Sequence, residues 1–218
     1  MPRERKTDTI KRATEVEKRM FKHYGEGIAS LDYDGDPFRL VVAVVLSAQC
    51  TDAAVNKVTP ALFKAYPTPA ALGKAKVSDV EKIIHSLGFF RSKAANLVKL
   101  GRMLEVEFDS KVPNDIDLLQ KLPGVGRKTA NVVMCEAFHN PQGIAVDTHV
   151  FRIAHRLKFA GPSADTPDKT EKALLSVYPQ PDWLYINHQW VHFGRDFCRA
   201  QRPVCEECFI NDLCPSKQ

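Results

Sequence analysis

The chain has 218 residues, of which 44% are hydrophobic and 26% charged, and a formal net charge of +5. This composition is typical of a soluble globular protein with one large or two small domains, and the mild positive charge suits a polyanionic partner without requiring one. The most hydrophobic run, residues 40–46, is far shorter than the ~20 residues that cross a bilayer. The first 21 residues lack the apolar core of a secretory signal. Composition therefore predicts an intracellular, soluble protein.

The predicted elements are almost all helices, because apolar residues recur at i, i+3, i+4 and i+7, and no convincing alternating strand is present. The valine-rich segment 38–47 would also suit a strand, but the Asp36-Pro37 cap before it favours a helix. A capping box beginning at Ser78 and a glycine stop at Gly194 mark two further expected helix ends. The expected helices cover residues 9–24, 38–47, 52–66, 78–87, 92–107, 116–122, 129–138, 148–157, 167–178 and 181–193.

Two of the expected loops carry residues that have two interpretations each. Gln49 falls in a short polar loop between helices, and Phe89 directly follows the expected helix stop at Gly88. A loop amide is usually incidental surface, and an apolar ring at a loop tip is usually a core contact. Proteins that distort DNA, however, insert side chains of both kinds into the base stack. Both interpretations stay open at this point.

The segment Leu122–Thr129, with the sequence Leu-Pro-Gly-Val-Gly-Arg-Lys-Thr, predicts a tight turn between two helices. Gly124 and Gly126 can take positive φ and let another backbone approach closely. The amide groups that open the second helix have no partners within it, and together with the helix dipole they form a site for a phosphate. A plain structural turn is the alternative, because Gly-x-Gly is common.

Lys128 lies in the first turn of that second helix, where the dipole disfavours a cation. Neutralising an ordinary lysine at pH 7 costs on the order of 4–5 kcal/mol. A helix start and partial burial both favour the neutral amine, which is the form that makes a Schiff base. This placement suits a nucleophilic lysine; the alternative is that Lys128 is an ordinary member of the 31 lysines and arginines of the chain. Asp147, further along, precedes a helical pattern and would cap it; a cap can also serve as a catalytic carboxylate.

Four of the six cysteines crowd into the C-terminal region, at Cys198, Cys205, Cys208 and Cys214. In a reducing compartment such a group favours a metal centre over disulfides. Ligands that are all cysteines suit zinc or an iron–sulfur cluster, and their spacing does not choose between them. Three arginines lie beside or within this loop and would either contact phosphates or only aid solubility: Arg195, Arg199 and Arg202.

Taken in order, several motifs resemble the endonuclease III family of base-excision-repair enzymes. They are Ser47-Ala48-Gln49 with Thr51-Asp52, the hairpin 122–131, Val146-Asp147-Thr148-His149 and the cysteine spacing. The resemblance extends from about residue 30 to Cys214 and implies an all-α, helix-hairpin-helix DNA glycosylase fold. It implies a six-helix barrel domain over 30–142, and a discontinuous helical domain from 1–29 and 143–218 that carries a 4Fe-4S cluster in the loop 198–214.

The resemblance also implies the chemistry and the setting. The protein would be a bifunctional DNA glycosylase and AP lyase, active as a monomer on double-stranded DNA that contains damaged pyrimidines or abasic sites. Lys128 would attack C1′ of the flipped nucleotide, and Asp147 would stabilise the developing positive charge. The four cysteines would hold a 4Fe-4S cluster in place of zinc, and the protein would be cytoplasmic and associated with the nucleoid.

The same resemblance implies a set of DNA-binding residues. Gln49 falls where the family fills the gap left by the flipped base, and Phe89 falls at a second intercalating position, where a well-known relative has leucine. Further contacts would come from Leu122, Gly124, Val125, Gly126, Arg127, Thr129, His149, Arg199 and Arg202.

Two alternatives compete with this interpretation. The adenine-mismatch glycosylases share the hairpin and the cluster but lack the lysine, so Lys128 argues against them. A non-catalytic iron–sulfur module that binds damaged DNA would need neither Lys128 nor Asp147.

Overall fold

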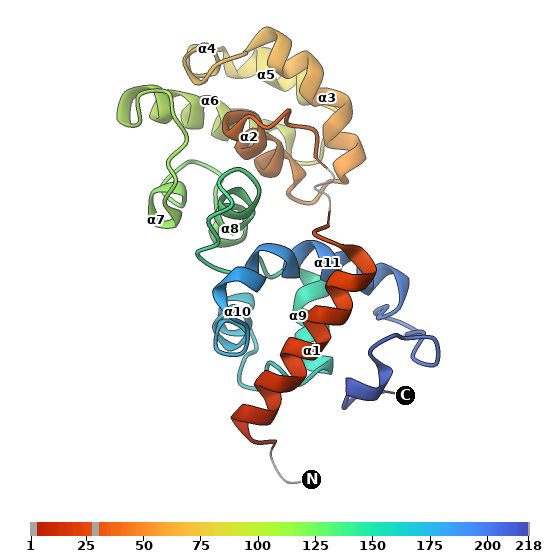
Figure 1. Ribbon diagram of the computed structural model, residues 1–218. Helices are drawn as coiled ribbons and strands as arrows, with labels where there is room; N and C mark the ends of the chain where they lie inside the picture. The colour runs from red at the N-terminus through yellow and green to blue at the C-terminus, as the bar shows by residue number, and fades with distance from the viewer. Residues whose placement is uncertain (1–3, 28–30, 218) are drawn as a thin grey trace. The chain divides into compact units, whose positions relative to one another are not determined.

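The computed structural model describes residues 4–27 and 31–217, and every helix or strand assigned within them is helical, which confirms the all-α prediction (Figure 1). By its contacts the chain divides into two compact units. One unit combines Met1–Ile28 with Pro141–Gln218, and the other is Ala29–Asn140. We call them the terminal unit and the central unit. Over the described residues, no helix combines the length and the apolar character that a membrane span needs.

The central unit is built around its first helix, which is buried on nearly all sides. A helix that is apolar all round belongs in a core, and this burial explains why the valine-rich segment forms a helix. Asp36 caps it by accepting a hydrogen bond from the amide of Phe38 at 2.8 Å. The helices of this unit are α2 (Pro37–Ser47), α3 (Asp52–Ala65), α4 (Pro69–Gly73), α5 (Val77–Ile84), α6 (Phe90–Glu107), α7 (Ile116–Leu119) and α8 (Arg127–Glu136).

Helix α4 was not among the helices expected from the sequence, which left residues 67–77 without one. Thr68 caps it, and the helix then crosses α6 closely where two glycines meet. A Cβ on Gly73 would lie 2.6 Å from the amide nitrogen of Arg102, and one on Gly101 would lie 2.7 Å from the carbonyl oxygen of Pro69. The pairing of these glycines therefore permits the contact that holds the short helix.

The terminal unit joins the two ends of the chain. Helix α1 packs against α11 (Figure 1). Met20, Trp190 and Phe193 are among the largest buried side chains of this unit. The helices of this unit are α1 (Lys6–Tyr24), α9 (Thr148–Arg156), α10 (Pro167–Leu175), the 3-10 turn η1 (Gln180–Asp182), α11 (Trp183–Asp196) and the 3-10 turn η2 (Asn211–Leu213).

Two of the expected helix ends were wrong. Ser78 does not open α5, because the helix begins at Val77 and its N-cap residue makes no side-chain capping bond. Gly194 does not stop α11, which continues to Asp196. Glycine is needed there for space: a Cβ would lie 2.7 Å from Cδ2 of His149. The residue that resembles a helix stop is therefore a close-packing position inside the helix.

Candidate active site and cysteine loop

The turn between α7 and α8 uses its two glycines differently. Gly124 has φ +84°, and a Cβ there would lie 3.1 Å from Cγ1 of Val45, so both conformation and packing require glycine. Gly126 has an extended φ of −92°, and a Cβ would meet nothing within 4 Å. The first glycine shapes the turn, while the second leaves open space in front of α8.

The start of α8 carries Lys128 in its first turn, with no acidic residue there and no side-chain cap. The side chain of Lys128 is exposed, so the expected partial burial was wrong. Of the two features expected for Lys128, a helix start and partial burial, the structure has only the helix start. Arg127 and Thr129 are half-buried beside it.

Leu122 and Val125 belong to the hydrophobic core, with exposed fractions of 2% and 7%. Their side chains therefore point into the core and are not on the surface of the turn. Gly124 and Gly126 are exposed in the same turn. What the turn presents at the surface is consequently backbone.

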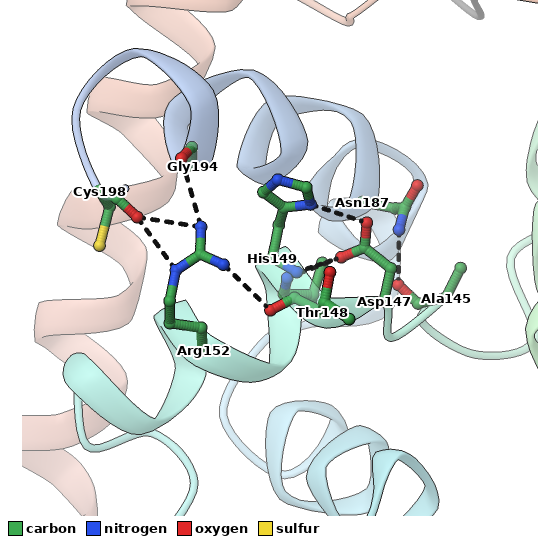
Figure 2. A network of polar contacts seen from close by, with 9 residues as sticks. Ala145, Asp147, Thr148, His149, Arg152, Asn187, Gly194 and Cys198 are labelled. Atoms are coloured by element: carbon green, nitrogen blue, oxygen red, sulfur yellow. Dashed lines mark hydrogen bonds and ion pairs between the residues drawn. The ribbon is translucent and has the colours of Figure 1, made fainter. Parts of the chain in front are cut away.

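Asp147 is the N-cap residue of α9, as the sequence predicted. Its Oδ1 accepts from the amides of His149 and Val150, both at 2.8 Å. Its Oδ2 lies 3.2 Å from Nδ1 of His149 (Figure 2). An ionised carboxylate only accepts hydrogen bonds, so Nδ1 carries the proton in this contact. The carboxylate, whose side chain is 16% exposed, is thus held by three hydrogen bonds from a single helical turn.

The ring of His149 is packed in a defined position. The missing side chain of Gly194 makes room for it, and Figure 2 shows the ring lying between Asp147 and α11. Its side chain is 26% exposed. Packing against Gly194 orients the ring, and the ring in turn orients Oδ2 of Asp147.

Two arginines on α9 bind the first part of the cysteine loop. Nη2 of Arg152 donates to the carbonyl oxygens of Gly194 and Cys198 at 3.2 and 3.0 Å (Figure 2). Arg156 donates from Nη1 to the carbonyl oxygen of Arg199 at 2.6 Å and to Sγ of Cys198 at 3.3 Å. Sequence reasoning missed both residues. Their i, i+4 spacing on an amphipathic helix was the available signal, but nothing local names their partners.

All four cysteines of the loop line one pocket. Burial raises the pKa of Cys208 to about 11, and the other three cysteines add to the rise, so the four sulfurs are close enough to influence one another. Within the described part of the chain, no three metal-binding side chains are placed to hold a single ion. Sulfur geometry by itself therefore does not choose the group that the loop holds. Arg199 and Arg202 are exposed at its edge.

Gln49 and Phe89 both lie at exposed loop positions of the central unit. Phe89 is 67% exposed, which excludes the interpretation that it is a core contact. Both residues have positive φ, 55° and 58°. The two residues expected to be catalytic belong to different units. Lys128 is in the central unit and Asp147 is in the terminal unit.

Comparisons with known proteins identify the family. Residues 42–180 match the HhH-GPD superfamily of base excision DNA repair proteins, and residues 198–214 match the iron–sulfur binding domain of endonuclease III. The endonuclease III of Synechocystis sp. is 46% identical over 207 residues, which cover 95% of this chain and 93% of the relative. The chain belongs to the endonuclease III family.

Solved structures agree with this membership. A trapped endonuclease III–DNA covalent intermediate is 43% identical, covers 95% of this chain and 96% of its own, and superposes with a TM-score of 0.87. A non-covalent endonuclease III–DNA complex gives 0.86 with the same identity and coverage. A thermostable thymine-DNA glycosylase, 24% identical over 97% of each chain with a TM-score of 0.81, shares the fold.

Family membership settles what the protein does in outline. It is a bifunctional DNA glycosylase and AP lyase of base excision repair. Its C-terminal loop binds an iron–sulfur cluster, and the matched residues begin at Cys198 and end at Cys214. The pocket lined by the four cysteines and the bond from Arg156 to Sγ of Cys198 fit this cofactor, because hydrogen bonds to ligand sulfurs are typical of such sites.

Proposed function

We propose that Lys128 is the nucleophile and Asp147 the catalytic carboxylate, acting on double-stranded DNA that contains a damaged pyrimidine or an abasic site. The observation that carries this proposal is the exposed lysine at the uncapped start of α8, directly after the turn made by Gly124. The 43% identity to the protein of a trapped covalent DNA intermediate supports a covalent mechanism.

In the proposed mechanism the damaged nucleotide is flipped out of the stack at the cost of a few kcal/mol. Nζ of Lys128 bonds to C1′ while the bond from C1′ to the base breaks. Asp147 stabilises the positive charge that develops on the sugar and takes part in the proton transfers. Nζ gives up a proton, the bond from C1′ to O4′ opens as O4′ takes up a proton, and the C=N bond of the Schiff base forms. Loss of a proton from C2′ to a base then expels the phosphate oxygen from C3′, and water hydrolyses the Schiff base to return the lysine. The strand is cut on the 3′ side of the lesion.

The proposed DNA contacts come from both units. The exposed backbone of Gly124 and Gly126 and the open amides of α8 suit a phosphate. Gln49 and Phe89 suit the space that the flipped nucleotide leaves, since both are exposed on loops. Arg199 and Arg202 suit phosphates further along, a role that positions the protein without reading sequence.

The cysteine loop contributes position more than chemistry. When bound, a 4Fe-4S cluster would supply a cross-link among the four cysteines that fixes the backbone of the loop. Arg199 and Arg202 are then held on a rigid frame, which Arg156 ties to α9 through the carbonyl oxygens of Arg199 and Ala200.

The proposal includes a monomer that works on the chromosome, and hence in the bacterial cytoplasm at the nucleoid. The relatives that it resembles are bacterial, and its substrate is DNA. Sedimentation of the purified protein with and without duplex tests the monomer directly, and a dimer in either sample contradicts it.

Borohydride trapping on an oligonucleotide that carries thymine glycol or an abasic site tests the nucleophile. We expect a covalent adduct with the natural protein and none with Lys128→Gln, while the affinity for DNA remains substantial because the turn and wedges are intact. Lys121→Gln, which removes an exposed lysine just before the turn, is the control and should trap normally. A persistent adduct in Lys128→Gln shows that another amine is the nucleophile. A panel of oxidised pyrimidines and an adenine mismatch then defines the lesion class.

A further inference from the structure

Two loop tips of the central unit share an unusual backbone conformation. Gln49 precedes α3 with φ 55°, and Phe89 precedes α6 with φ 58°. For residues other than glycine this left-handed region is sparsely populated and strained. Both tips are exposed. Such strain persists only where the surrounding structure enforces it, so something must hold each tip in place.

The two loops meet behind their tips. Nζ of Lys93, in the first turn of α6, donates to Sγ of Cys50 at 3.0 Å. The amide of the same lysine donates to the carbonyl oxygen of Phe89 at 3.0 Å. A Cβ added at Gly88 would lie 3.9 Å from both Sγ of Cys50 and the carbonyl oxygen of Gln49, so the two loops lie near each other there. One lysine thus links the base of the Phe89 tip to the residue that follows Gln49.

The position of Lys93 is costly in two ways. Its exposed fraction is 5%, and a buried ammonium loses its hydration. It also lies near the positive end of the α6 dipole, with no acidic residue in that first turn. The thiol of Cys50 is the only hydrogen-bond partner that its ammonium has among the described residues. An apolar side chain of the same length would destabilise the folded protein less at this position. The contact between Lys93 and Cys50 therefore contributes something other than stability.

We propose that Cys50 and Lys93 form a clamp that sets the spacing of the Gln49 and Phe89 tips, and that this clamp controls how well the protein unstacks a damaged base. The inference rests on the proposed wedge function of the two tips. Cys50 and Lys93 are positioning residues, because each acts through its neighbour in the loop. The clamp therefore governs the step in which the base leaves the stack and leaves the affinity for undamaged DNA nearly unchanged.

The test uses the full-length protein with its cluster and a duplex that holds thymine glycol opposite 2-aminopurine, whose fluorescence rises when it is unstacked. We expect Lys93→Met to lower both the fluorescence rise and the single-turnover rate of base release by about 10-fold, since a misplacement near 1 Å has effects of this size or larger. The dissociation constant for undamaged duplex should change less than about twofold, because the charge it removes is buried. Lys99→Met removes an exposed charge from the same helix and should leave the fluorescence and the rate unchanged.

Two further variants at Cys50 test whether Cys50 and Lys93 act through their shared contact. Cys50→Ala should match Lys93→Met, and the double variant should be no worse than either single one, because both remove the same contact. Cys50→Ser keeps an acceptor for the ammonium and should recover most of the rate and of the fluorescence rise. Additive losses, or no recovery with serine, overturn the clamp.

The wedge function and the clamp can fail separately. If Gln49→Ala and Phe89→Ala leave base release unchanged, the wedge function fails. If they slow it while Lys93→Met behaves like Lys99→Met, the clamp fails. A Lys93→Met protein that loses affinity for undamaged duplex and thermal stability in parallel also overturns the clamp, since the pair is then only structural; Cys50→Ser, which retains the contact, decides the case if Lys93→Met does not fold.

Discussion

The two helices that carry the proposed catalytic pair begin in opposite ways. At α9 the carboxylate of Asp147 occupies two of the opening amides and is itself held by them. At α8 the capping position is Gly126, which has no side chain to offer, and Lys128 adds a positive charge to the same turn. One helix start is closed by its own chain, and the other is open.

The presence or absence of a cap suits the two helix starts to different functions. Glycine at the capping position forgoes only a few tenths of a kcal/mol, and a cation beside the dipole costs roughly 0.3–1 kcal/mol more, so α8 gives up stability at the place where a phosphate would bind. The closed start of α9 gains that stability and also fixes a carboxylate in one orientation. Stability and chemistry coincide at Asp147 and compete at Lys128.

The largest effect should come from removing the charge of Asp147 while keeping its cap. Asparagine caps as well as aspartate, so Asp147→Asn should retain the thermal midpoint of the terminal unit. We expect the single-turnover rate of base release to fall by about 10²–10³-fold, because the sugar loses its electrostatic stabilisation. Base release on thymine glycol duplex and calorimetry measure the two quantities.

Asp147→Ala is the matched variant that loses both the helix cap and the negative charge. It should lose the rate as Asp147→Asn does and, in addition, about 1 kcal/mol of stability. If Asp147→Asn keeps the natural rate, Asp147 is only a cap, and the carboxylate that assists Lys128 must be sought elsewhere.

A smaller effect should follow when the carboxylate keeps its charge and loses its orientation. His149→Leu removes the contact from Nδ1 to Oδ2 and leaves both backbone bonds to Oδ1. We expect a loss of roughly 10- to 30-fold in the rate of base release, in line with the sensitivity of rates to small misplacements. His149→Asn places an amide N–H near the position of Nδ1 and should recover most of it.

The dependence on substrate concentration separates orientation from DNA contact. If His149 acts mainly on Asp147, kcat falls and KM stays nearly constant in His149→Leu. A rise in KM with an unchanged kcat would assign the residue to DNA binding alone, as its place among the expected DNA contacts suggested.

The start of α9 could be predicted from sequence because its signal is local. Asp147 stands directly before the apolar spacing of the helix, and cap and helix lie within one turn of each other. The all-helical fold followed from the same kind of local periodicity. The cysteine loop followed from spacing as well, although its choice of an iron–sulfur cluster needed the family resemblance.

Several of the errors share a cause, which is that a local pattern does not show contacts between distant segments. Gly194 looked like a helix stop, and the ring of His149, from another helix, requires its missing side chain. Lys128 was expected to be partly buried, but no neighbouring segment covers it in the described structure. Two of the residues that Arg152 binds, Gly194 and Cys198, lie more than 40 positions away. A pattern within one helix carries no information about which helix it meets.

We expect the smallest effect from a substitution that adds a capping side chain at the start of α8. Gly126→Asp places a capping carboxylate at a position with extended φ and no neighbour within 4 Å of its Cβ, so the substitution introduces no strain. We expect the central unit to gain roughly 0.5–1 kcal/mol in a denaturant titration, a few tenths from the cap and the rest from a negative charge beside the helix dipole. The affinity for duplex DNA should fall by about 5- to 10-fold, because the carboxylate competes with a phosphate for the amides and repels it. Gly126→Ala has neither the cap nor the charge and serves as the control for the lost glycine. Greater stability with unchanged affinity would show that the phosphate does not bind at this helix start, and the contrast between the two helices would then be one of stability alone.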